Sequence, residues 1–372
     1  FTASKLMWVK NNEPQVFSKM SKVLLPKDYI RFMLTGVFAS EVSDASGTQL
    51  LDIANRRWSD DIINALGFKP DWLPDVFEST VISGHINAEA ARLTGLIEGT
   101  PVAGGGGDQA AGGVGNGIVR EGIVSSTIGS SGVVFAHLDN ISIDKLGRVH
   151  TFCHAVPGKW HVMGVTQAAG ISLKWFKDNF CTAEKEVANN LGVDVYDIMC
   201  REAAKSAPGS NGIVYLPYLM GERTPHLDPN AKGVFFGLSA IHNKSDMIRA
   251  VLEGVSYSLV DCIEIIRSMG VEISEVRASG GGGRSELWRQ IQADMFNTNI
   301  ITLSSSEGPC LGAAIIAGTG VGVYKDIYTA CSQAQKVNTL QKPIKENADR
   351  YAAGYRLYKA LYPALSHLYK AF

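Results

Sequence analysis

The sequence predicts a two-domain α/β protein. A chain of 372 residues, 45% of them hydrophobic, is long enough to build two separate cores. Its first part indicates short helices and turns, whereas the part after about residue 118 indicates a hairpin and strand–loop–helix units. We therefore place a first domain over residues 1–118 and a second over residues 119–372.

Charge and cysteine content exclude several classes of protein. The 35 basic and 36 acidic side chains leave a net charge of −1, which argues against nucleic acid or an anionic membrane as a partner. The six cysteines lack the spacing of a zinc site or a disulfide framework, as is usual in a reducing compartment. The longest apolar stretch, residues 310–324, is too short and too rich in glycine to span a bilayer. We expect a cytoplasmic protein without a membrane segment.

Helix-start and helix-stop residues define the elements of the first hundred residues. Proline is favoured at the first helical position, glycine just after the last, and serine at the N-cap. These signals predict helices that start at Pro14, run from Pro26 to Gly36, and run from Ser59 to Gly67. Short strands interrupted by glycine are expected at 81–87 and 100–107.

The second part begins with an expected hairpin over 122–138, in which a Gly/Ser turn joins two alternating strands. The clearest helix runs from Ser245 to Met269, with Ser245 as its cap, one apolar stripe along its length and Gly270 after its end. A strand at 275–279 then leads into four glycines and a helix that starts near Ser285.

A stripe of tyrosines indicates a C-terminal helix between Tyr351 and Tyr369, with Pro363 expected to kink it. Such a helix docks on its own domain or on a second subunit. A homodimer is therefore among the expected assemblies, and we assign no chemistry to the stripe.

Three glycine-rich segments follow expected strands, at 104–107, 129–132 and 280–283. Exposed backbone amides after a strand can hold an anion, and the start of a following helix adds positive potential. Each segment alone is more simply a tight turn, since none fits the GxxxxGK[ST] or GxGxxG pattern. Together they favour phosphate chemistry.

A single carboxylate, Asp108, follows the first glycine segment. Transfer of a phosphoryl group needs a base that accepts the proton of the attacking hydroxyl, and Asp108 has the right chemistry for it. Gln109 beside it can both donate to and accept from a polyol. The alternative interpretation is that Asp108 caps a helix that begins at Gln109, but this would leave the glycines before it unexplained.

Four segments resemble the FGGY carbohydrate kinases. They are GVFFGLSAIHNKSDMIRAVLE at 233–253, LPYLMGERTPHLDPNAKG at 216–233, GGGGDQAAGGVGNGIV at 104–119 and ASGGGGRSELWRQI at 278–291. Within the family, FTASKLMWVK, VLLPKDYIRFMLTG and SDASGTQLLD are similar to segments of the xylulokinases. The likeness extends from Phe1 to about Tyr324.

The resemblance implies a ribonuclease-H-like, actin-related kinase whose two domains bring a sugar and ATP together. The implied reaction is transfer of the ATP γ-phosphate to the 5-hydroxyl of D-xylulose, with Mg²⁺. The implied site consists of the base Asp108, also indirectly near the metal, the sugar contact Gln109, the phosphate-loop residues Thr127, Gly129 and Ser131, the weaker glycine position Gly170, and the adenosine motif Gly280, Gly281, Gly282 and Ser285.

The chain departs from the family pattern at its start. The D-x-G-T phosphate loop and the Met-His-Gly-type stretch are not found in this sequence, and DASGT at 44–48 has the wrong context to replace them. We expect a preceding segment of roughly one hundred residues, the size of a small domain, and expect the chain without it to be inactive.

Other functions stay open from the sequence. A kinase of the same family could act on L-ribulose or gluconate, and an actin- or Hsp70-like ATPase also holds ATP between glycine loops. A sensor that binds no nucleotide would require 280–283 to serve packing alone. We also expect the glycines of residues 112–117 to serve as a hinge for domain closure.

Overall fold

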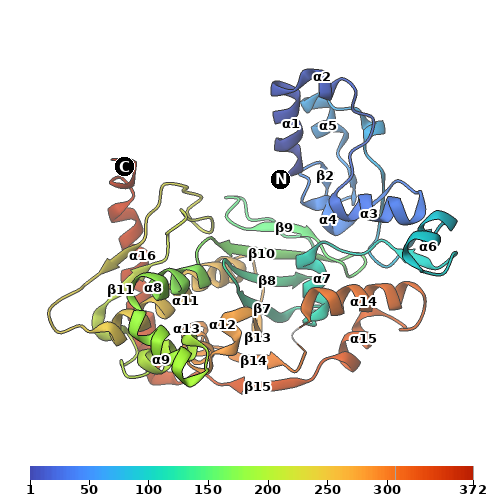
Figure 1. Ribbon diagram of the computed structural model, residues 1–372. Helices are drawn as coiled ribbons and strands as arrows, with labels where there is room; N and C mark the ends of the chain where they lie inside the picture. The colour runs from blue at the N-terminus through green and yellow to red at the C-terminus, as the bar shows by residue number, and fades with distance from the viewer. Residues whose placement is uncertain (306, 372) are drawn as a thin grey trace.

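The structure, a computed structural model, describes residues 1–305 and 307–371. The first hundred residues form a small body beside the β9 (His150–Cys153) and β10 (Trp160–Thr166) edge of a large sheet (Figure 1). The helices of this body are α1 (Thr2–Asn12), α2 (Pro14–Phe17), α3 (Pro26–Thr35), α4 (Val42–Ser46), α5 (Asp60–Leu66) and α6 (Ala88–Thr94). Its strands pair as β1 (Ala39–Glu41) with β4 (Asp75–Phe77), β2 (Leu51–Asp52) with β3 (Arg57–Trp58), and β5 (Ile82–His85) with β6 (Pro101–Ala103).

The expected helix ends in this body are confirmed. Pro26 opens α3 and Gly36 ends it in the left-handed conformation, at φ 75°. The Ser59 side chain caps α5, and Gly67 ends that helix in the same way. Residues 44–46 belong to α4, whose N-cap is the Glu41 side chain.

A seven-stranded sheet forms the centre of the rest of the chain. Its spatial order is β15 (Val337–Gln341), β14 (Asn299–Leu303), β13 (Ile273–Ser279), β7 (Gly122–Ile128), β8 (Gly132–Leu138), β10 and β9. The strands β7, β13 and β14 run parallel, whereas β8, β10 and β9 follow β7 as antiparallel neighbours. The hairpin expected over 122–138 is confirmed as β7 and β8.

Helices cover both faces of this sheet. Successive side chains of a strand point to opposite faces, so Val134 and Ala136 pack in the core that contains α11 (Lys244–Ser268), while the ring of Phe135 presses on Gly113 of α7 (Asp108–Gly115). On the first face lie α8 (Gly170–Phe180), α9 (Thr182–Leu191), α10 (Val195–Ala203) and α13 (Glu286–Phe296), with the strand pair β11 (Val214–Leu216) and β12 (Val234–Phe236). On the second face α7 packs with α14 (Gly308–Gly320) and α15 (Ile327–Ala334) (Figure 1).

The long helix α11 is confirmed, but its expected cap was wrong. Asn243, not Ser245, caps α11 and accepts from the backbone amides of Ser245 and Asp246. The Asp246 carboxylate in turn accepts from the Asn243 amide at 3.0 Å, which completes a capping box. The hydroxyl of Ser245 instead donates to Glu202.

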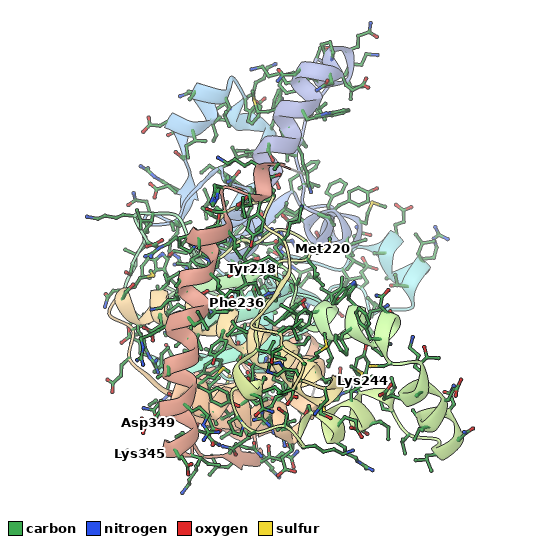
Figure 2. All side chains as sticks on the ribbon, turned by 90° about the vertical axis from the view of Figure 1, so that its left-hand side faces the viewer. Tyr218, Met220, Phe236, Lys244, Lys345 and Asp349 are labelled. Carbon is green, nitrogen blue, oxygen red and sulfur yellow. The ribbon has the colours of Figure 1, made fainter. Side chains whose placement is uncertain are left out.

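The C-terminal helix α16 (Lys345–Leu365) docks on its own domain. Figure 2 looks onto this helix, with Lys345 and Asp349 in its first turns. Tyr351 and Tyr358 are buried against α11, and the hydroxyl of Tyr218 donates to that of Tyr358 at 2.9 Å. Pro363 lies inside α16, which continues to Leu365. In the described residues, no helix has both the length and the apolar character needed to cross a membrane.

Three buried histidines, His137, His154 and His161, form a cluster beside Phe135. The ring of His161 stacks on Phe135 with 4.4 Å between ring centroids, and neither of its nitrogens has a hydrogen-bond partner in the described chain. Burial lowers the pKa of His161 to about 3, and it also lowers the pKa values of His154 and His137. Burial therefore disfavours the protonated form of all three imidazoles in the folded state.

We expect this cluster to make the protein sensitive to acid. Because the folded-state pKa of His161 lies below the ordinary value of 6.5, the unfolded chain binds the extra proton, and stability falls from pH 6.5 towards pH 3. His161→Phe keeps the ring stack and should reduce that slope by up to about 1.4 kcal/mol per pH unit. Urea unfolding at several pH values measures it, with exposed His85→Gln as the control. An unchanged slope in His161→Phe would contradict the prediction.

Candidate active site

A cleft of about 630 Å³ lies where α7, β7 and β13 meet the start of α14. Five of the residues expected at the site line it: Asp108, Gln109, Thr127, Gly280 and Gly281. Asp108 is the only carboxylate among the described lining residues, and Arg277 and Arg284 supply positive charge. The guanidinium of Arg277 is already bound to Glu275 and to the carbonyl oxygen of Asn116. The cleft therefore combines one acid with charge suited to phosphate.

Asp108 is the first residue of α7. It follows Gly107, which has no side chain to cap the helix. One carboxylate oxygen of Asp108 accepts from the amide of Gln109 at 2.8 Å, and the side chain is otherwise exposed. A carboxylate in this position is able to accept a proton from a bound hydroxyl.

The glycines before Asp108 also have a structural reason, which corrects our interpretation that they were otherwise unexplained. A Cβ on Gly104 would lie 2.8 Å from the carbonyl oxygen of Glu78, and Gly105 has a positive φ of 80°. A Cβ on Gly107 would touch Asp44. The segment is thus bare partly because residues of the first body pack closely against it.

The glycines of residues 112–117 lie mostly inside a helix and pack closely there, while their expected role as a hinge stays a prediction. Gly112, Gly113 and Gly115 are buried in α7. A Cβ on Gly115 would overlap the carbonyl oxygen of Gly308 at the start of α14. The close approach of two helix backbones requires glycine here.

A second cavity of about 360 Å³ adjoins the first. Of the expected residues, it is lined by Gly129, Gly170, Gly281, Gly282 and Ser285. Gly281 and Arg284 line both cavities, so the two share a boundary. An elongated ligand that fills both would extend from Ser285 towards Asp108.

The turn between β7 and β8 and the segment after β13 are held together at this boundary. The hydroxyls of Thr127 and Ser279 are 2.7 Å apart, and Ile128 and Gly280 pair as an isolated parallel β-bridge. The amide of Gly170, the first residue of α8, donates to the carbonyl oxygen of Gly129 at 2.9 Å. Three segments far apart in sequence therefore meet at one place.

The four glycines at 280–283 form a helical turn, α12 (Gly280–Arg284), where we expected a loop. Gly280 has φ 72°, and a Cβ on Gly282 would lie 2.6 Å from the side chain of Ile128. The helix expected to start near Ser285 is confirmed as α13, and the hydroxyl of Ser285 caps it by accepting from the amide of Trp288 at 3.2 Å. Packing against the end of β7 explains the glycines of α12.

Sequence reasoning missed some lining residues and included one that lines neither cavity. Ser131, expected in the phosphate loop, is in neither lining set, whereas its neighbour Ser130 lines the second cavity. Arg284 was not singled out, although its place between Gly283 and Ser285 in the strand–glycine–helix segment could have indicated it. Lys174 and Trp288 also line the second cavity, and only the folded chain brings them to it.

The acid Asp44 of α4 lies beside Gly107. Burial raises the pKa of Asp44 to about 6, Lys27 opposes the rise, and the nearby carboxylates of Glu41, Asp28 and Asp108 add to it.

The described residues contain no group of three or more His, Cys, Asp or Glu side chains placed to hold a metal ion.

Comparison with known proteins identifies the family. The N-terminal domain of the FGGY family of carbohydrate kinases matches residues 1–115, and the C-terminal domain matches residues 124–321. The chain is 40% identical over 362 residues to a xylulose kinase of Bacillus subtilis, an alignment that covers 97% of this chain and 70% of the relative.

Two solved structures from Lactobacillus acidophilus share the fold. A ligand-bound xylulose kinase superposes with a TM-score of 0.92 and a gluconate kinase with 0.91, each at 27% identity and each covering 100% of this chain and 73% of the other. The fold is thus the ribonuclease-H-like, actin-like fold implied by the sequence motifs. These matches, together with the cleft that gathers Asp108 and the glycine segments, show that the chain belongs to the FGGY family of carbohydrate kinases.

Proposed function

We propose that this protein transfers the γ-phosphate of ATP to the 5-hydroxyl of D-xylulose. The observation that carries the proposal is the pair of adjoining cavities, with Asp108 in the first and Ser285 in the second. The relatives named xylulose kinase support the choice of sugar. Family membership sets aside the alternatives of an actin- or Hsp70-like ATPase and of a sensor that binds no nucleotide.

In this proposal ATP spans both cavities. The adenosine lies near Gly282, Ser285 and Gly170 in the second cavity, and the phosphates extend along Gly129 and Gly281 to the first. The guanidinium of Arg284, which lines both cavities, would neutralise phosphate charge. Thr127 would contact the phosphates from the end of β7.

The sugar hydroxyl attacks the γ-phosphorus in line. A bond forms between the hydroxyl oxygen and the γ-phosphorus, and the bond from that phosphorus to the bridging β–γ oxygen breaks, which releases ADP. Asp108 accepts the hydroxyl proton, and Gln109 orients the sugar through its amide. Positioning and charge neutralisation supply most of the rate enhancement.

Mg²⁺ is part of the proposal. It binds ATP phosphates together with one or two carboxylates, and Asp108 is the single acid among the described residues that line the cleft. Asp108 would act on the ion indirectly, since its carboxylate must take the proton. When bound, Mg²⁺ would offset phosphate charge. A cytoplasmic location, a homodimer and a domain boundary near residue 118 stay predictions.

A panel of substrates tests the function. We expect ADP release to be fastest with D-xylulose, by at least about tenfold in kcat/KM over L-ribulose, gluconate and glycerol. If gluconate is turned over fastest, gluconate replaces D-xylulose as the proposed substrate. Gluconate is the second candidate because a gluconate kinase shares the fold. ADP release that is indifferent to any sugar would contradict the proposed reaction.

A further inference from the structure

Residues of the first body hold the segment before Asp108 through several hydrogen bonds, one of them from the amide of Gly104 to the carbonyl oxygen of Val81 at 2.8 Å. The guanidinium of Arg31 donates to the carbonyl oxygen of Gly104 at 2.6 Å, and the amide of Gly105 donates to the carbonyl oxygen of Ser79 at 2.9 Å. The contact nearest to Asp108 is that of the Gly107 amide, which donates to the Ser43 hydroxyl at 3.0 Å. Residues 104–107 are therefore restrained by hydrogen bonds from outside the segment.

The orientation of the Ser43 hydroxyl is determined by a buried carboxylate. Glu41 is fully buried, and its Oε1 accepts from the Ser43 hydroxyl at 2.9 Å. The same carboxylate accepts from the amides of Ser43 and Asp44 and from the Ser79 hydroxyl. Because the hydroxyl proton points to Glu41, an oxygen lone pair is left to accept from Gly107.

A charged pair flanks the same glycine. A Cβ on Gly107 would lie 3.4 Å from Oδ1 of Asp44, so the carboxylate is in contact with that backbone. The Asp44 carboxylate is 3.8 Å from the ammonium of Lys27, which also lies 3.0 Å from Asp28 and 3.5 Å from Glu41. Lys27 thus balances the acids that surround the segment.

We infer that Ser43 and Asp44 of α4 are positioning residues for Asp108: the Ser43 hydroxyl fixes the amide of Gly107, and the Asp44 carboxylate packs against the same residue. The inference rests on the proposed role of Asp108 as the base. Gly107 is the N-cap of α7 and offers no side chain of its own, so these contacts replace the usual restraint at a helix start. Displacement of a catalytic group by about 1 Å can reduce the rate about 100-fold.

The first test replaces the hydroxyl. The variants are made in the protein expressed from its complete gene. We expect Ser43→Ala to lower kcat with D-xylulose by roughly tenfold or more, while KM for ATP changes by less than about twofold. Ser43→Thr keeps a hydroxyl and should retain most of kcat. Asp44→Asn keeps the volume of the side chain and should lower kcat without raising KM for ATP.

A matched control separates positioning from stability. Ser46 is buried in the same helix, but its hydroxyl bonds to Val42 and to the amide of Cys153, not to the glycine segment. Ser46→Ala should therefore keep kcat, with melting temperatures recorded for every variant. The inference would be overturned if Ser46→Ala lost as much kcat as Ser43→Ala. It would also be overturned if Ser43→Ala kept its kcat while Asp108→Asn was inactive. An active Asp108→Asn would overturn the proposed base instead.

Discussion

Asp108→Asn is expected to lower kcat for sugar phosphorylation by about 10²- to 10⁴-fold, the usual contribution of a general base. Asparagine has nearly the same shape, but its amide cannot take the proton of the attacking hydroxyl. Asp108 is exposed, and its one hydrogen bond in the described chain, from the amide of Gln109, can also be accepted by an asparagine oxygen. The melting temperature should therefore be unchanged. Release of ADP with saturating D-xylulose measures the effect.

Asp60→Asn provides the matched control for this variant. Asp60 is likewise exposed at the first position of a helix, α5, but that helix lies in the first body away from the cleft. We expect it to keep the activity of the unchanged protein. If Asp108→Asn retains more than about a tenth of the rate, the assignment of Asp108 as the base is wrong.

Gly312→Ala is expected to destabilise the protein by about 3 kcal/mol, at the upper end of the cost of overpacking. Gly312 lies in α14 against α7, and a Cβ there would overlap the carbonyl oxygen of Ala111. The atoms that this Cβ would meet all belong to the backbone of α7, so no change of rotamer relieves the overlap and the helices must move apart. Since α7 begins with Asp108, kcat should fall as well. Thermal and urea unfolding measure the loss of stability.

Gly112→Ala is the control for packing in the same helix pair. Its Cβ would lie 3.6 Å from Cγ of Pro309, an ordinary van der Waals distance. Because alanine favours the helix over glycine by about 1 kcal/mol, this variant should be as stable as the unchanged protein or more so. Equal stability of Gly312→Ala and Gly112→Ala would show that α7 and α14 do not depend on a glycine contact.

Much of the local structure could be predicted from the sequence because the signals act over a few residues. Pro26 and Gly36 mark the ends of α3, Ser59 caps α5 as expected, and α13 begins near Ser285 as expected. The family motifs also gave the fold and the group of residues around Asp108. At α11 the sequence predicted Ser245 as the cap, whereas Asn243, two residues earlier, caps the helix.

The tertiary structure alone decided why the glycines stand where they do. Gly107 meets Asp44, Gly115 meets Gly308, and Gly282 meets Ile128, each a contact between segments far apart in the chain. A glycine has no side chain, so no polar or apolar pattern in the sequence indicates which segment packs against it. The sequence therefore showed where the glycines are but not which residues approach them. The sequence thus determined the family and the helix ends and pointed to Asp108, while the packing of distant backbones determined how Asp108 is held.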